Sequence, residues 1–257
     1  DILKNFSEIN QSIVIKEGNE IKTISALKNI LSKAVVKESF PKDFAIYDLP
    51  TFIGFHSTMN VPEFEFKDDC VIMEDKHGKG KYFYAEPSLV VTPPEKDIDM
   101  PESDIKFELK NDVLEDIMKK ANVLKLADIG LKSCPKSKGL YLYATNKKTD
   151  TSNDYSVKVG ESNGEDKFNI IFKKDNLKII PGDYIVTITN GISHFKYSDK
   201  KYDLDYWIAL EADSQYKGEW YEKEKTGKQE TIKESIKKKK QNYLSDCWRY
   251  SRDIWTR

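Results

Sequence analysis

The first 91 residues alternate between stretches with helical periodicity and stretches with strand periodicity. Ile2, Leu3, Phe6 and Ile9 are spaced as on one face of a helix, so we predict a helix over residues 2–9. A second short helix is predicted to begin near Asp48, which would cap it while Pro50 occupies its first turn. Strands are predicted within residues 12–25, 44–47 and 63–87.

Residues 105–214 repeat this order of elements. The clearest helix spans residues 111–124, where one apolar stripe is formed by Val113, Leu114, Ile117, Met118, Ala121 and Leu124. A second short helix is predicted over DNLKII, residues 175–180. Strands are predicted within residues 105–110, 126–133, 139–146, 154–162, 166–172, 184–199 and 202–213.

The repeated order predicts the fold class and the domain organisation. Each half follows the order helix, strands, short helix, strands, and FAIYDLPTFIGF (44–55) occupies the place that FNIIFKKDNLKIIPGDY (168–184) occupies later. We predict an α+β protein with two similar domains, each with antiparallel sheet and two helices. The predicted parts are domain 1 (1–91), an acidic, Pro-rich connector (92–104), domain 2 (105–214) and a basic, aromatic extension (215–257).

Charge is unevenly distributed along the chain, whose net charge is only −1. Residues 215–257 contain 12 Lys and Arg against 7 Asp and Glu, a net charge of +5. The remaining 30 Lys and Arg against 36 Asp and Glu give residues 1–214 a net charge of −6. An acidic body and a basic tail are therefore expected to differ in function.

The cysteines and the apolar runs indicate an intracellular protein. Cys70, Cys134 and Cys247 are odd in number and widely spaced, which favours reduced thiols over disulfides. No apolar run approaches the length of a membrane span and no signal peptide is recognisable, so no membrane partner is expected. Because the numbering starts at Asp1 rather than Met, we expect a few residues to precede it.

The chain contains no motif of a known catalytic, cofactor or metal site. Gly78-Lys79-Gly80 lies between two predicted strands, which indicates a hairpin rather than a phosphate-binding loop. The three histidines, His56, His77 and His194, are far apart and lack metal-ligand spacing. We therefore predict a protein that is not an enzyme and that needs no cofactor and no metal.

Four segments carry a resemblance to a known family. They are ILKNFSEINQSIVIKEGN (2–19), FAIYDLPTFIGF (44–55), NLKIIPGDY (176–184) and YWIALEADS (206–214). In order and spacing they resemble the sliding clamps of T-even-type bacteriophages, the processivity factors of the replicative DNA polymerase. The resemblance extends from residue 1 to about residue 214, and we interpret residues 25–43 and 145–155 within it as variable loops.

The resemblance implies a ring and a set of partners. Clamps of this family are head-to-tail homotrimers with two domains per subunit, and twelve helices line a hole through which double-stranded DNA passes. Such an interface closes without a free end and joins edge strands across subunits. The implied partners are the replicative DNA polymerase, the ATP-driven clamp loader complex and late-transcription factors, all in the cytoplasm of the infected bacterial host.

Lysines on the repeated helices are the predicted contacts to DNA, because cations attract phosphates without regard to base sequence. The six candidates are Lys4, Lys119, Lys120, Lys173, Lys174 and Lys178. The family has basic residues at the positions of Lys4, Lys119 and Lys178, whereas Asn122 stands where it allows another one. The second helix has no lysine and offers only His56. For each lysine alone, a solvated surface position is the competing interpretation.

The family also binds the C-terminal tails of its partners in a hydrophobic pocket near the interdomain connector. The apolar residues beside the connector here are Leu89, Val90 and Val91. The strand residues Tyr206, Trp207 and Ile208 are expected nearby. Burial in the sheets explains the same residues without any pocket.

The extension beyond residue 214 matches no family that we recognise. It contains TIKESIKKKK (231–240) and YLSDCWRYSRDIW (243–255), with Trp248, Tyr250 and Trp255 close to four consecutive lysines. Lysines and rings together are typical of single-strand nucleic-acid binding. A linker-like, partner-binding or gene-fusion extension is the interpretation we favour, and docking of the aromatic end in a clamp pocket stays open as well.

Two other functions compete with a sliding clamp. A single-strand DNA-binding or recombination accessory protein would use aromatic residues such as Tyr141 and Tyr143 as stacking platforms together with the basic tail. A virion structural protein would also be rich in strands and oligomeric. Retention on circular but not on linear DNA separates the clamp from both.

Overall fold

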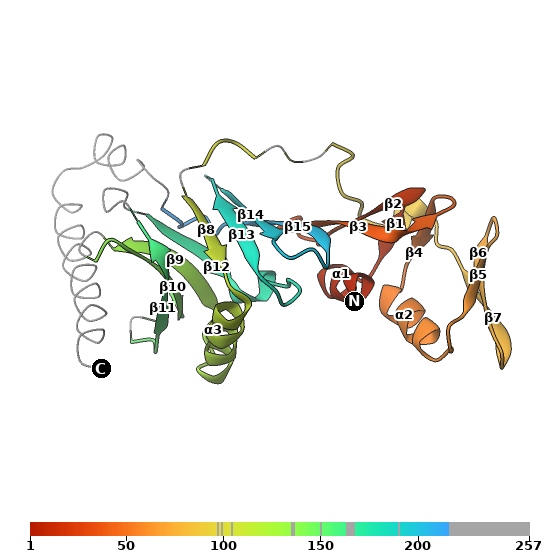
Figure 1. Ribbon diagram of the computed structural model, residues 1–257, viewed down its shortest axis with the longest axis horizontal. Coiled ribbons are helices and arrows are strands. Elements are labelled where there is room, and N and C mark those ends of the chain that lie inside the picture. The colour runs from red at the N-terminus through yellow and green to blue at the C-terminus, as the bar shows by residue number, and fades with distance from the viewer. Residues whose placement is uncertain are drawn as a thin grey trace. The chain divides into compact units, whose positions relative to one another are not determined.

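The chain forms two compact units, each assembled from segments that are distant in the sequence (Figure 1). A computed structural model describes residues 1–96, 98, 100–103, 105–134, 137–149, 151–162, 168–189 and 191–215. Unit 1 consists of residues 1–106 and 175–209, and unit 2 of residues 107–174 with the described residues from 210 onward. The boundaries that we expected at 91, 104 and 214 stay a prediction, and the extension lies outside the described residues except for Gln215.

Unit 1 contains most of a six-stranded sheet. Its spatial order is β2 (Gly18–Ile24), β3 (Ile30–Phe40), β15 (Asp203–Ala209), β14 (Ile192–Tyr197), β13 (Tyr184–Ile188) and β8 (Ile105–Leu109). Neighbouring strands from β2 through β13 run antiparallel. The sheet thus combines strands from both halves of the sequence.

The longest of these strands, β3, lies within residues 25–43, so our interpretation of that whole segment as a variable loop was wrong. Its residues pair on one side with β2, as Ile21 does with Ala34, and on the other with β15, as Trp207 does with Leu31. Two long-range partners therefore determine the conformation of β3. Exposed residues of the segment lie in the short turn that includes Leu27 and at the end of β3 around Lys37.

Helix α1 (Ile2–Ile9) packs on this sheet and is held there by polar contacts. Phe6 is fully buried, and the amide of Asn5, only 8% exposed, bridges two other elements. Its oxygen accepts a 2.7 Å hydrogen bond from the hydroxyl of Tyr206 in β15, and its nitrogen donates to the Lys178 carbonyl at 3.0 Å. The helix, the strand and the segment before β13 thus share one buried side chain.

The helix predicted over residues 175–180 is replaced by a shorter element, the 3₁₀ turn η2 (Lys174–Asn176). Two backbone groups of the following residues bond to side chains instead of to a helix: the Lys178 carbonyl bonds to Asn5, and the Ile180 N–H donates to the Tyr206 hydroxyl at 3.2 Å. Pro181 also disfavours a helical conformation of the residue before it. The described residues therefore form three α-helices instead of the four expected.

Unit 1 also contains helix α2 (Leu49–Ser57) and two smaller sheets. The sheets are β1 (Ile13–Ile15) with β4 (Phe44–Ile46), and β5 (Glu63–Phe66), β6 (Cys70–Asp75) and β7 (Gly78–Phe83). Asp48 caps α2 as predicted, because its carboxylate accepts the Thr51 N–H at 2.9 Å. A Cβ at Gly80 would lie 2.1 Å from the Phe55 ring, so only glycine permits this approach of β7 to the helix.

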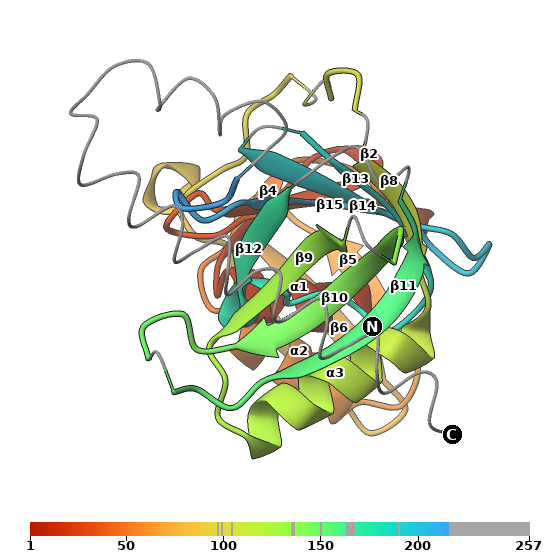
Figure 2. The same cartoon turned by 90° about the vertical axis from the view of Figure 1, so that its left-hand side faces the viewer.

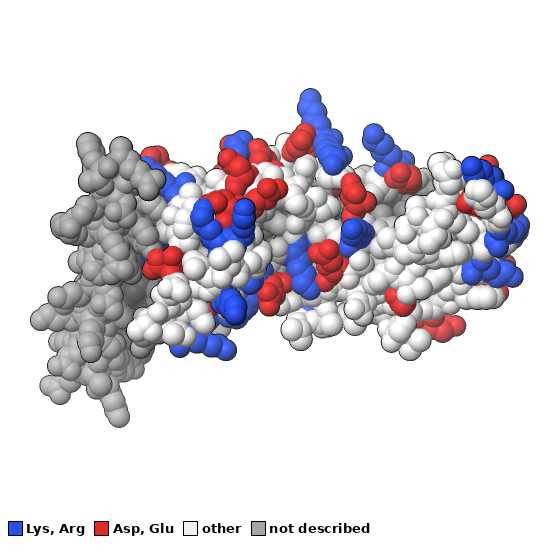
Figure 3. Space-filling model, turned by 90° about the horizontal axis from the view of Figure 1, so that it is seen from below, with Lys and Arg blue, Asp and Glu red and all other residues white. Residues whose placement is uncertain are grey.

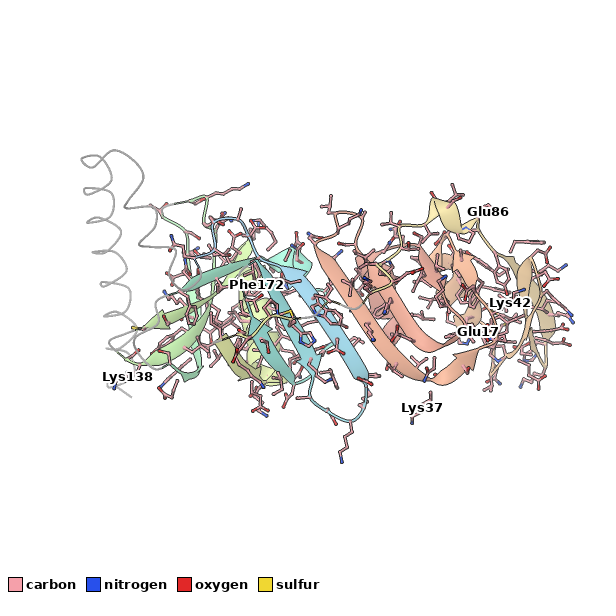
Figure 4. The ribbon with its side chains drawn as sticks, turned by 90° about the horizontal axis from the view of Figure 1, so that it is seen from above. Glu17, Lys37, Lys42, Glu86, Lys138 and Phe172 are labelled. Atoms are coloured by element: carbon pink, nitrogen blue, oxygen red, sulfur yellow. The ribbon has the colours of Figure 1, made fainter. Side chains whose placement is uncertain are left out.

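Unit 2 is built on a four-stranded sheet with helix α3 (Asn111–Val123) beside two of its strands (Figure 2). The strand order is β11 (Tyr155–Glu161), β10 (Gly139–Thr145), β9 (Asp128–Cys134) and β12 (Asn169–Lys173). The predicted apolar stripe of α3 is buried at Leu114, Ile117 and Ala121. Phe172 of β12, labelled in Figure 4, is likewise buried.

One edge of this sheet is covered by the chain itself. After β15, Glu211 donates its N–H to the Ile171 carbonyl at 2.8 Å, and Gln215 exchanges two hydrogen bonds with Asn169. This short segment lies along β12, so among the described residues β11 is the strand of this sheet that keeps an open edge. In the three-stranded sheet of unit 1, β7 is likewise an edge strand.

Candidate DNA-contacting lysines and a docking cluster

Lys4 on α1 and Lys119 on α3 are exposed lysines without a partner in the described part of the chain. No carboxylate there approaches either ammonium within ion-pair distance. No carboxylate therefore compensates the charge of either side chain. These are two of the positions at which the resemblance implied a basic residue.

Lys120, one residue further along α3, differs from Lys119 because its ammonium has partners in the structure. Its ammonium pairs with Asp116 one turn earlier, lies 4.2 Å from the centre of the Tyr155 ring and donates to the Tyr155 hydroxyl at 3.1 Å. The hydrogen bond from Lys120 lowers the pKa of the Asp116 carboxyl, and the same bond raises the pKa of Lys120. The charge of Lys120 is thus compensated locally, and the side chain attaches α3 to β11.

Lys173, at the end of β12, also has a compensated charge. It pairs with Asp128, whose side chain is 1% exposed, and lies 3.5 Å from Glu211. Asp128 additionally accepts the backbone N–H of Lys147, and the Lys147 ammonium pairs with Glu211 and with Asp213. The hydrogen bond to Asp128 raises the pKa of Lys173. This network connects β9, β12 and the segment after β15, so Lys173 has a structural role.

Lys174 and Lys178 bind neutral oxygens, so no carboxylate compensates their charge. The Lys174 ammonium donates to the Asn122 side-chain oxygen at 3.0 Å. The Lys178 ammonium donates at 2.6 Å to the Glu8 carbonyl near the C-terminus of α1, where the helix dipole favours a cation. Asn122, which we noted as a departure from the family pattern, thus orients a neighbouring lysine.

Helix α2 differs from α1 and α3 because it has no lysine or arginine at all, as its surface in Figure 3 shows. Its histidine, His56, is exposed in the last turn and stacks on Phe64 of β5 with 5.6 Å between the ring centres. Among the six candidate lysines, four are therefore not paired with a carboxylate: Lys4 and Lys178 in unit 1, Lys119 and Lys174 in unit 2. The contact roles of all six lysines stay a prediction.

The predicted docking residues fall into three different environments. Leu89, which ends the short helix η1 (Pro87–Leu89), and Val91 are 65% and 42% exposed, whereas Val90 is buried. Tyr206 and Ile208 are fully buried. Trp207 points to the opposite side of β15 from Tyr206, since side chains alternate along a strand.

Trp207 forms an apolar cluster with residues that the sequence analysis did not single out. Ile24 of β2 and Leu31 of β3 are its buried neighbours, and the partly buried side chains packed against the three are Ile98, Met100 and Ile192. We call these six residues the connector cluster. Figure 1 shows the connector passing over the face of the six-stranded sheet opposite α1. Ile98 and Met100 are the two large apolar side chains of an acidic, Pro-rich segment, and this contrast is the sequence signal by which they could have been found.

A polar pair borders the connector cluster. The ring of His194 stacks on Trp207 with 4.9 Å between the ring centres, and its Nε2 lies 2.7 Å from an oxygen of Asp205. The indole N–H of Trp207 itself is buried and has no acceptor among the described residues. The cluster thus combines apolar surface with one unsatisfied donor.

The described residues contain no group of three or more acidic, histidine or cysteine side chains that fits a metal, and no helix long and apolar enough to span a membrane. Cys70 and Cys134 are buried and form no disulfide, while Cys247 lies outside the described residues. Tyr141 is buried, and Tyr143 bonds to Asn169 at 2.6 Å. Neither ring is a platform for nucleic-acid bases, so the stacking interpretation of these two residues was wrong.

Comparison with known proteins agrees with the resemblance. A family model described as gp45 sliding clamp, C terminal, matches residues 106–212. The sliding clamp of Vibrio phage KVP40 is 32% identical over 217 residues, which cover 82% of this chain and 96% of the relative. The sliding clamp of Enterobacteria phage T4 is 30% identical over 229 residues, covering 83% and 94%.

Solved structures confirm the predicted α+β clamp fold. The PCNA of A. fulgidus, solved with the C-terminal region of FEN-1 bound, has a TM-score of 0.62 at 12% identity and covers 83% of this chain and 95% of its own. The Helicobacter pylori beta clamp, bound to a DNA ligase peptide, has a TM-score of 0.52 at 15% identity and covers 81% and 63%. At these identities the likeness establishes the fold alone.

Proposed function

This chain belongs to the sliding clamps of T4-type bacteriophages, and from that premise we propose that it encircles duplex DNA as a closed homotrimer and tethers the replicative DNA polymerase. The observation that carries the proposal is that four lysines on or beside the repeated helical elements are not paired with a carboxylate: Lys4, Lys178, Lys119 and Lys174. Lysines bind phosphates by releasing counterions, independently of sequence. That is the interaction a protein needs if it must stay on DNA and still slide.

The open sheet edges support the homotrimer. β7 and β11 are edge strands, and exposed apolar side chains accompany both. Phe83 in β7 is 62% exposed, while Val123 and Leu124 at the end of α3 are 75% and 38% exposed. Pairing of β7 in one subunit with β11 in the next would cover both edges and this apolar surface, and a head-to-tail contact of this kind closes into a ring.

The proposed partners follow from the same premise. The relatives named above include a PCNA with a FEN-1 segment bound and a beta clamp with a ligase peptide bound, which supports tail docking in this chain too. We place that docking at the connector cluster and assign it to the polymerase, to the ATP-driven clamp loader and to late-transcription factors. We also infer that the protein has no catalytic activity of its own and works in the cytoplasm of the infected host.

The proposal is tested by polymerase stimulation on primed circular DNA. We expect the unaltered chain to stimulate a cognate polymerase there and to lose this effect on linear DNA with open ends. Charge reversal at all four uncompensated lysines should lower stimulation by about tenfold or more, because four phosphate contacts become repulsive. The matched control is Lys37→Glu, which changes an exposed lysine in β3.

Two results would overturn the proposal. One is a monomer in light scattering at micromolar concentration together with no stimulation on circular DNA. The other is full stimulation by the fourfold variant, since the lysines would then be ordinary surface. The light-scattering mass of the variant is measured alongside, because loss of the trimer by itself would remove stimulation.

A further inference from the structure

Two connector side chains of the connector cluster, Ile98 and Met100, are held to its buried residues by apolar packing. Ile98 and Met100 lie against Trp207, Ile24 and Leu31. In the described part of the chain, neither Ile98 nor Met100 forms a hydrogen bond. The indole N–H of Trp207 is buried and has no acceptor among the described residues, and the residue as a whole is only 8% exposed. A buried donor of this kind favours a ligand that brings a carbonyl oxygen along with apolar side chains.

The connector over the cluster is acidic, whereas the lysines on the same sheet face, Lys22 and Lys33, are both paired with Glu20. The connector, residues 92–104, contains five Asp and Glu against one lysine. Of these, Glu95 and Glu102 are exposed on either side of Ile98 and Met100. An occupant of the cluster should therefore combine aromatic or aliphatic anchors with positive charge.

The C-terminal extension of this chain has that chemistry. Four consecutive lysines, 237–240, are followed at once by YLSDCWRYSRDIW (243–255). Residues 231–257 contain 8 Lys and Arg against 3 Asp and Glu. The match to the sliding-clamp family model ends at residue 212, so this segment is a feature of the chain in addition to the shared domain.

We propose that residues 243–255 of this chain dock on the connector cluster, with Trp248 and Trp255 as anchors and the lysines 237–240 beside the acidic connector. The inference rests on the proposed docking role of that cluster and adds a regulation to it. A tail of the clamp itself would compete with the tails of its partners. A partner would then have to displace it, which lowers the apparent affinity of every partner by the same factor, set by the fraction of clamps whose cluster is free.

The linker between Gln215 and Tyr243 is long enough for the proposed docking. Gln215 is bonded to Asn169, and 27 residues separate it from Tyr243. At about 3.3 Å per residue an extended linker of that size spans on the order of 90 Å, well beyond the diameter of a small domain. The proposal therefore needs no particular arrangement of the two units.

Cys247, next to Trp248, allows a direct test on the full chain. Cys70 and Cys134 are 3% and 2% exposed, so a thiol-reactive benzophenone should label Cys247 selectively. After irradiation, trypsin releases the connector as the peptide of residues 97–106, which contains Met100. We expect the main crosslink to join Cys247 to this peptide. If no crosslink to this peptide is found, or if the crosslinks are spread over peptides elsewhere in the chain, the proposal is overturned.

A double substitution tests whether the tail itself, rather than the benzophenone on Cys247, binds to the connector. Trp248→Ala with Trp255→Ala keeps Cys247 and should lower the yield of the connector crosslink by about tenfold, because aromatic anchors dominate such contacts. An unchanged yield would assign the crosslink to the benzophenone and contradict docking. Tyr216→Ala, close to the start of the tail, is the matched control and should leave the yield unchanged.

The same variants distinguish this inference from the proposed function. If the crosslink is absent while the unaltered chain stimulates the polymerase on circular DNA, tail docking is refuted and the clamp function stands. If the crosslink forms but no stimulation occurs, the clamp function fails independently. A polymerase tail peptide should bind the double tryptophan variant several-fold more tightly than the unaltered chain, and equal affinities would contradict competition.

Discussion

Tyr206 and Trp207 are neighbours on β15, and they differ in whether their buried polar group is hydrogen-bonded. The Tyr206 hydroxyl donates to Asn5 of α1 and accepts the N–H of Ile180, so its buried polar atom is fully used. The Trp207 indole N–H has no acceptor in the described structure, and the residue is held by apolar packing and by stacking of the His194 ring. The α1 face of the sheet is thus fixed by a specific polar network, whereas the connector face is built so that its cover can be exchanged.

The largest effect is expected on the α1 face, from Asn5→Ala. The substitution leaves the Tyr206 hydroxyl and the Lys178 carbonyl without their partner in a buried site. We expect the free energy of unfolding to fall by about 2–4 kcal/mol, because each unsatisfied buried group costs about 1–3 kcal/mol. Urea unfolding followed by circular dichroism at fixed protein concentration measures this. Ser7→Ala on the same helix is the control, and equal effects of the two would refute the role given to Asn5.

On the connector face, Met100→Ser should have a smaller effect on stability. The side chain is only partly buried, so we expect a loss of about 1 kcal/mol in the free energy of unfolding, less than for a fully buried methionine. The same change should alter the binding of a polymerase tail peptide, measured by fluorescence anisotropy. A loss of stability as large as that of Asn5→Ala, with unchanged peptide binding, would show that the connector is a fixed part of the fold.

Lys178→Met separates the structural and the DNA-binding parts of one side chain. The methionine keeps the length of the side chain and loses the bond to the Glu8 carbonyl, so we expect a loss of about 0.5–1 kcal/mol in stability. Polymerase stimulation on circular DNA should also fall and should become less sensitive to salt, since one phosphate contact is lost. Lys37→Met, at the exposed position labelled in Figure 4, should change neither quantity.

The smallest effect is expected from Trp207→Phe. The change removes some apolar contact and also removes a buried donor that lacks an acceptor, and these effects oppose each other. We expect the free energy of unfolding to change by less than about 1 kcal/mol, whereas the affinity for a tail peptide should fall. A destabilisation well above 2 kcal/mol would mean that the indole N–H is satisfied in solution and that the connector face is as specific as the α1 face.

Local patterns were sufficient to predict much of the fold. The stripe of α3 and the cap at Asp48 depend on residues a few positions apart; the cap is found as expected, and the stripe is buried at Leu114, Ile117 and Ala121 but not at its end, Leu124. The missing helix over residues 175–180 depends instead on Asn5 and Tyr206, which lie far away in the sequence and occupy its backbone groups. For the same reason β3 was missed, because its partners come from both halves of the chain.

The roles of the lysines and the members of the connector cluster likewise depend on contacts between residues that are distant in the sequence. Sequence spacing placed six lysines on or beside the repeated elements, yet it could not tell which ones are compensated. Lys120 and Lys119 are adjacent, and only the position of Tyr155 and Asp116 separates their roles. Lys173 is compensated by Asp128, 45 positions earlier. Likewise, Ile24 and Leu31 join Trp207 only through the pairing of β2, β3 and β15.

The short segment from Glu211 to Gln215 has a practical consequence for protein engineering. It leaves the body of the clamp along β12, at the sheet edge that it covers itself, while the open edge of that sheet is β11 on the other side. A fluorescent protein or an affinity tag joined after Gln215 would therefore be attached away from the strand that we assign to subunit pairing. Labelled clamps for single-molecule tracking are best built from this position.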